Sequence, residues 1–115
     1  MAKRNIPITD CTVDFAFQRI GGKYKGRILW YLHANSILRY GELRRTVKGI
    51  TAKMLTQTLR ELEEDQLIGK KVYLEARPKV EYSLSEGGKE LIPFIKYLHK
   101  WGENRMTGMN AGNPA

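Results

Sequence analysis

The sequence is poor in the residues that build disulfides and metal sites. Cys11 is the only cysteine among 115 residues, and His33 and His99 are the only histidines. A single thiol cannot close an internal disulfide, and histidines this far apart, with no cysteine at ligand spacing, do not suit zinc. We therefore expect no metal ion and no cofactor, and a chain suited to a reducing compartment.

Long apolar runs are also missing. No stretch approaches the roughly 20 apolar residues that a membrane-spanning helix requires. Residues 1–9 carry the charges of Lys3 and Arg4 and contain no hydrophobic signal core. We expect a soluble cytoplasmic protein that has no membrane partner.

Acidic residues are also few relative to basic residues. The chain has 20 Lys and Arg against 12 Asp and Glu, a formal net charge of +8. Such a balance favours polyanionic partners, with nucleic acid ahead of an anionic membrane surface. The length and a hydrophobic fraction of 42% are typical of one compact domain.

The sequence also lacks the parts of a catalytic site. Gly21, Gly22 and Lys23 resemble a phosphate loop only superficially, because Tyr24 stands where that loop needs Ser or Thr. A nucleophilic cysteine needs a histidine base, and nothing in the sequence places His33 or His99 beside Cys11. We expect no enzymatic activity.

Apolar periodicity predicts four helices in the first half of the chain, over residues 11–20, 24–33, 40–47 and 51–65. The first has Val13, Ala16, Phe17 and Ile20 on one face, while Phe15 projects elsewhere and needs cover of its own. The Thr51 hydroxyl can cap the fourth helix. Lys48 and Gly49 join the last two helices by a short turn, which is the helix-turn-helix pattern.

The second half predicts a hairpin and a final helix. Residues 67–75 and 80–84 are rich in residues that suit strands, and the segment between them carries basic side chains, the arrangement called a wing. Ser85 can cap the last helix. Its apolar surface is wider than one core-facing stripe needs, which suggests a partner chain. That surface consists of Leu91, Ile92, Phe94, Ile95, Leu98 and Trp101.

The fourth predicted helix carries the candidate DNA-reading residues. Its leucines at 55, 59 and 62 share the side that the core must take. Acidic residues crowd its C-terminal end and would repel phosphate, so we expect the N-terminal half to dock. The candidates there offer groups that a major groove rewards. They are Thr51, Lys53, Met54, Thr56, Gln57 and Arg60, with Arg44 and Arg45 of the preceding helix and Arg77 and Lys79 of the wing.

Several separate segments resemble the HxlR family of bacterial winged-helix regulators, whose architecture is related to that of MarR regulators. They are "CTVDFAFQRIGGKYK", "RYGELRR", "KMLTQTLRELEEDQLI" and "VEYSLSEGGKEL". The resemblance implies a homodimer held by the first and last helices, for which Phe15, Phe94, Leu98 and Trp101 are the candidate contacts.

The expected fold is therefore α+β, mainly α: a winged helix-turn-helix with a two-stranded hairpin wing and N- and C-terminal dimerisation helices. We expect the domain to cover residues 11–103. Residues 1–10 are expected to form a flexible arm and residues 104–115 a flexible tail, because Gly, Asn and Pro accumulate there.

Cys11 has two interpretations of equal weight. Several relatives in this family sense oxidants or electrophiles through a cysteine near the N-terminus, and Cys11 occupies the matching position. The alternative is a small, partly buried residue without chemistry, since free cysteine behaves as a modest hydrophobe.

The function expected from this sequence is that of a DNA-binding transcriptional regulator. Two copies would bind a pseudo-palindromic operator in double-stranded DNA, with repression as the default effect. The alternative is a winged-helix module that binds another protein and has no specific DNA site. The sequence identifies neither the operator nor any small-molecule effector.

Overall fold

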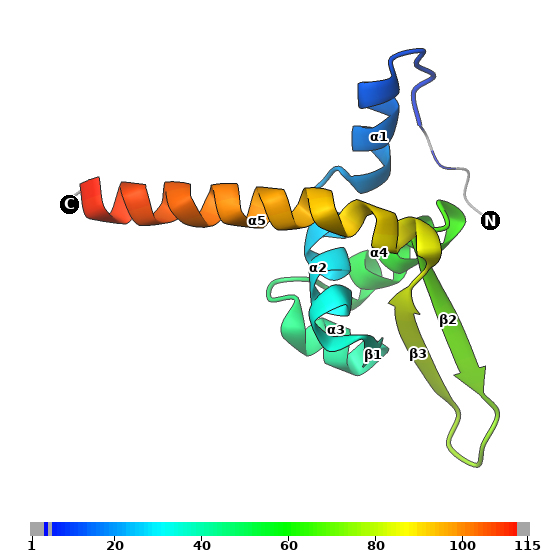
Figure 1. Cartoon of the computed structure of the whole chain (residues 1–115). Helices are drawn as coiled ribbons and strands as arrows, with labels where there is room; N and C mark the ends of the chain where they lie inside the picture. The colour runs from blue at the N-terminus through cyan, green and yellow to red at the C-terminus, as the bar shows by residue number, and fades with distance from the viewer. Residues whose placement is uncertain (1–3, 5, 113–115) are drawn as a thin grey trace.

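The computed structural model describes residue 4 and residues 6–112, which form five helices and a three-stranded sheet (Figure 1). The elements in chain order are α1 (Thr12–Ile20), α2 (Lys25–Asn35), β1 (Ile37–Arg39), α3 (Tyr40–Thr46), α4 (Ala52–Glu64), β2 (Ile68–Tyr73), β3 (Lys79–Leu84) and α5 (Glu86–Gly112).

The core lies between α2, α3 and α4, where the apolar positions recur at helical spacing. The predicted core face of α4, with Leu55, Leu59 and Leu62, is confirmed. Burying one large apolar side chain in this core stabilises the fold by about 1.5–3 kcal/mol. The largest fully buried side chains are Ile28, Leu29, Leu32, Leu43, Val47, Leu55, Leu59 and Leu62.

Both predicted hydroxyl caps are present. Thr51 Oγ1 accepts a hydrogen bond from the backbone N–H of Met54 at 3.1 Å, which satisfies one free amide at the start of α4. Ser85 Oγ accepts from the N–H of Gly88 at 3.2 Å and donates to the carbonyl of Gln66. Ser85 therefore begins α5 and also ties it to the turn that follows α4.

Gly88 lets α5 lie directly against that turn. A Cβ at position 88 would collide with the carbonyl oxygen of Leu67, and one at position 87 would lie 2.8 Å from the carbonyl oxygen of Gln66. Both contacts are with backbone, which cannot move aside cheaply. Two consecutive glycines thus allow a close approach that larger residues would prevent.

The sheet has one strand more than the hairpin alone. β2 and β3 form the predicted antiparallel wing, and β1 pairs with the other edge of β3, with Leu38 opposite Tyr82. β1 has only three residues, too few for a visible alternation of polar and apolar side chains.

The N-terminal helix α1 buries none of its residues. Val13 and Phe17 are 63% and 53% exposed, so most of the apolar face predicted for this helix is not covered by the core, and only Ile20 at its end packs against it. Figure 1 shows α1 standing away from the α2–α4 body on the side of α5. Its ring contact with α5 is an edge-on packing of Phe17 against Phe94, with centroids 6.3 Å apart.

The expected flexible arm and tail are described only in part, because residues 1–3, 5 and 113–115 lie outside the described residues. α5 continues to Gly112, so residues 104–112 are helical where a flexible tail was expected. Gly and Asn each weaken a helix by about 1 kcal/mol or less, which an already formed helix tolerates. Arg4, in the expected arm, is placed by ion pairs to the end of α4. The domain boundaries themselves remain predictions.

Among the described residues, no helix has the length and apolar character needed to cross a bilayer.

Candidate nucleic-acid interface

The first half of α4 presents the predicted reading face to solvent. Leu55 and Leu59, on the opposite side of the helix, are almost completely buried, so the orientation of α4 is set by its leucines. The protein's own fold therefore does not cover the candidate face. Its exposed side chains are Thr51, Lys53, Met54, Thr56, Gln57 and Arg60.

Tyr40, at the start of α3, joins the two helices of the helix-turn-helix unit. Its hydroxyl donates to the carbonyl of Ala52 at 2.9 Å and lies 3.1 Å from the Thr56 hydroxyl. Thr56 is thus positioned by α3 as well as by its own helix. This role of Tyr40 could not be predicted from the sequence, because its partners Ala52 and Thr56 lie 12 and 16 residues further along the chain.

Gln57 is held by an acidic neighbour one turn further along α4. Its Nε2 donates to Glu61 Oε2 at 2.8 Å, and Lys25 Nζ lies 2.9 Å from the other carboxylate oxygen. Burial acts to raise the pKa of Glu61, but the hydrogen bonds from Gln57 and Lys25 and the charges of Lys25 and Arg4 outweigh it and lower the pKa. Glu61 is therefore an ionised acceptor at neutral pH.

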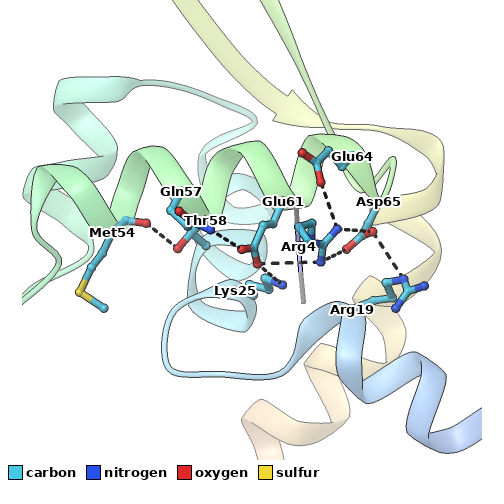
Figure 2. A network of polar contacts seen from close by, with 9 residues as sticks. All are labelled: Arg4, Arg19, Lys25, Met54, Gln57, Thr58, Glu61, Glu64 and Asp65. Atoms are coloured by element: carbon cyan, nitrogen blue, oxygen red, sulfur yellow. Dashed lines mark hydrogen bonds and ion pairs between the residues drawn. The ribbon is translucent and has the colours of Figure 1, made fainter. Parts of the chain in front are cut away.

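The acidic end of α4 is neutralised by cations from elsewhere in the chain (Figure 2). Arg4 binds Asp65 through two nitrogens, at 2.8 and 3.1 Å, and approaches Glu64 at 3.4 Å. The hydrogen bond to Asp65 is the main cause that raises the pKa of Arg4. Arg19 Nε lies 3.5 Å from the same Asp65.

These cations reduce the repulsion of phosphate that the acidic residues alone would cause. Arg4, Arg19 and Lys25 come from the N-terminal arm, α1 and α2, far from α4 in sequence. The acidic end of α4 is visible in the sequence, but its counterions are not. Periodicity and capping signals report on neighbours within a few residues and carry no signal for such pairings.

The two candidate wing residues, Arg77 and Lys79, differ in their structural setting. Arg77 is exposed in the turn between β2 and β3, as expected for a tip residue. Lys79 was expected in the same turn, but it is the first residue of β3, paired with Tyr73. The ammonium of Lys79 lies 4.7 Å from the centre of the Tyr73 ring, an attractive cation–π contact between the two paired residues.

The remaining basic candidates are spread over separate elements. Arg44 and Arg45 are exposed in the last turn of α3, where they also complement the helix dipole. Arg77 and Lys79 lie on the β2–β3 hairpin, which projects from the helical body (Figure 1). The α4 candidates form one continuous face, whereas the α3 and wing residues could only flank it.

The candidate dimer residues are exposed but do not form one cluster within a single chain. Phe94, Leu98 and Trp101 lie on α5 and are 37%, 44% and 52% exposed. Phe15, at 50%, is covered on one ring face by the Arg19 guanidinium, 3.9 Å from the ring centre. Phe17, which was not among the candidates, supplies the aromatic contact with α5.

Cys11 is an exposed free thiol at the start of α1. Its Sγ accepts a weak hydrogen bond from the backbone N–H of Asp14 at 3.5 Å, so it occupies the N-cap position of the helix. A chemical change at this sulfur would therefore alter the cap of α1.

Comparisons with known proteins agree on one group. The regulatory-protein relative named MalR in Fusobacterium mortiferum is 47% identical over 81% of this chain and 88% of its own length. YybR of Bacillus subtilis, named an HTH-type transcriptional regulator, is 46% identical over 82% of this chain and 74% of its own. The relatives are named as regulators and not as enzymes.

The similarity of fold extends over most of the chain. The structure of the redox regulator HypR in its reduced form matches with a TM-score of 0.81 and 39% identity, covering 88% of this chain and 99% of HypR. Its oxidised form matches with a TM-score of 0.77 and 42% identity over 82% and 96% of the two chains. The family model for the HxlR-like helix-turn-helix matches residues 19–109. The chain is therefore a winged helix-turn-helix protein that belongs to the HxlR-like helix-turn-helix family.

Proposed function

We propose that this protein is a transcriptional regulator that binds double-stranded DNA sequence-specifically, with the N-terminal half of α4 in the major groove. The observation that carries the proposal is the exposed face of α4, backed by buried leucines. Arg60 suits guanine, Gln57 suits adenine, and Thr56 suits phosphate or a thymine methyl group. The free amides at the start of α4 would favour a phosphate nearby.

The protein is proposed to act as a homodimer on a pseudo-palindromic site. The exposed aromatic and aliphatic side chains of α1 and α5 support this, because apolar surface of this kind is typical of an interface. Two reading helices related by a two-fold axis would enter successive major grooves about 34–36 Å apart. Bound in this way, the dimer would occlude the DNA, so repression is the proposed effect.

Substitution of Arg60 tests base recognition. Arg60→Ala is expected to reduce discrimination between operator and mismatched DNA by about 1–3 kcal/mol, because a bidentate contact to guanine is lost. The measurement is competition binding on duplexes that were selected with the wild-type protein. Lys96→Ala removes one exposed positive charge from α5 and is expected to leave that discrimination unchanged. Equal losses in both variants would favour a protein-binding module with an incidental basic surface.

We also propose that Cys11 adjusts DNA binding through thiol oxidation. An exposed thiol at the cap of α1 is accessible to an oxidant, and a disulfide between two copies would bond the N-terminal helices to each other. In that step two thiols lose two protons and two electrons to the oxidant and one S–S bond forms. HypR, with structures in oxidised and reduced forms, and the diamide-treated YodB of B. subtilis are similar in fold to this chain.

Diamide treatment tests the role of Cys11. Operator affinity of the wild-type protein is expected to change at least about tenfold after oxidation and to return after dithiothreitol. Tenfold corresponds to about 1.4 kcal/mol of coupling between thiol and DNA site, within the usual range for linked sites. Cys11→Ser keeps a cap of similar size and should not respond. If both proteins respond equally, Cys11 takes no part.

A further inference from the structure

Gln57 is on the exposed face of α4, yet its side-chain amide is held by a contact within the protein. Gln57 and Glu61 are one turn apart on α4, and such a pair alone stabilises a helix only slightly. Here the acceptor is itself fixed: Lys25 Nζ lies 2.9 Å from Glu61 Oε1, and Arg4 lies 3.9 Å from the same oxygen. The Lys25 side chain is 11% exposed, so the cation that holds Glu61 is largely buried.

Resting on the proposed function, we propose that Glu61 is a positioning residue that fixes Gln57 for one kind of base. A carboxylate can only accept hydrogen bonds, so the amide nitrogen of Gln57 must face Glu61 and its oxygen must face away. The glutamine amide could otherwise present either end to DNA. While Glu61 binds the amide nitrogen, only one orientation of the Gln57 amide is left.

The fixed orientation selects adenine. A primary amide has two N–H donors and one oxygen, and one donor is used on Glu61. The remaining N–H and Oε1 form the donor and acceptor pair that complements N7 and the N6 amino group of adenine in the major groove. An amide fixed before binding also loses less rotamer freedom on the DNA.

Glu61 has opposite effects on affinity and on selectivity under this proposal. Its negative charge lies one turn beyond Gln57, so removing it should strengthen sequence-independent attraction to phosphates. Removing it should also free the Gln57 amide to rotate and weaken the preference for adenine. A residue that only supports the fold would lower both quantities together.

The test uses duplexes selected by the full-length wild-type protein. The adenine read by Gln57 is the position at which Gln57→Ala loses its preference, and it is replaced by 7-deazaadenine, which lacks N7. For the wild type we expect about a tenfold loss of affinity on this replacement, equivalent to about 1.4 kcal/mol. For Glu61→Gln we expect a loss of about threefold or less, together with tighter binding to non-cognate DNA.

Glu63→Gln is the matched control, because it makes the same change in charge on the same helix while Glu63 pairs with Lys70. It should retain the full penalty for 7-deazaadenine. If Glu61→Gln proves unstable in thermal melts, Lys25→Met replaces it. This variant removes the cation that holds Glu61 and should reduce the same penalty.

The outcomes separate the two proposals. A full penalty for 7-deazaadenine in Glu61→Gln, or in Lys25→Met where that variant replaces it, overturns the positioning role and leaves DNA recognition by α4 intact. A penalty that grows in Glu61→Gln would mean that Glu61 withholds Gln57 from DNA, which also overturns the role. If the wild type shows no preference among duplexes, or if Gln57→Ala removes none of it, the reading of bases by α4 itself fails.

Discussion

Operator affinity is expected to fall about 10³- to 10⁵-fold between 50 and 200 mM monovalent salt if the dimer contacts roughly 6–10 phosphates. The net charge of +8 and the exposed cations of α3, α4 and the wing make that number of contacts reasonable for two copies. Each contact releases condensed counterions, and the release becomes less favourable as bulk salt rises. Fluorescence anisotropy over a series of salt concentrations measures the slope.

Lys53→Gln provides the internal check on this slope. Lys53 is exposed in the first turn of α4, and its loss should reduce the slope by about 1 for each copy bound. The effect should be the same on cognate and on random duplexes, because phosphate contacts are blind to sequence. A response to salt that is nearly flat would contradict DNA as the partner.

Leu98→Glu is expected to convert the proposed dimer into a monomer. Leu98 is 44% exposed on α5, near Phe94 and Trp101, which are 37% and 52% exposed. In a two-fold interface the substitution occurs twice, and each unpaired buried carboxylate costs on the order of 3–5 kcal/mol. The dimer dissociation constant should rise at least about 10⁴-fold, measured by sedimentation equilibrium.

Leu74→Glu is the control for this experiment. Leu74 is 90% exposed in the wing turn, so the same change of side chain meets no interface there and should leave the dimer intact. Leu98→Glu should also weaken operator binding more than binding to a single half-site. Dimers that persist in Leu98→Glu would show that α5 is not the dimer contact.

Features encoded by neighbouring residues could be predicted from the sequence. The leucine face and the Thr51 cap of α4 depend on spacings of three and four residues, and both are present. Since the leucines fix which side of α4 is buried, the exposed positions of Gln57 and Arg60 followed from the same pattern. Most of the candidate reading face can therefore be predicted from the sequence alone.

Features that join distant segments could not be predicted in this way. Leu38 opposes Tyr82, and Arg4 binds Asp65, which is 61 residues away. With 20 cationic side chains available, nothing in the linear pattern selects Arg4 as that partner. The exposure of α1 depends in the same way on how the whole core assembles, and apolar spacing alone cannot distinguish a core face from an interface.

The length of α5 has a consequence for the spacing of DNA half-sites. A helix of 27 residues with a rise of 1.5 Å per residue is a rod about 40 Å long. That length is close to one turn of B-form DNA, the separation between the two grooves that a dimer would read. In the proposed dimer, the length of the paired α5 helices would set the distance between the two reading helices. Operators whose halves are moved apart by two or three base pairs would then be bound only by straining a continuous helix.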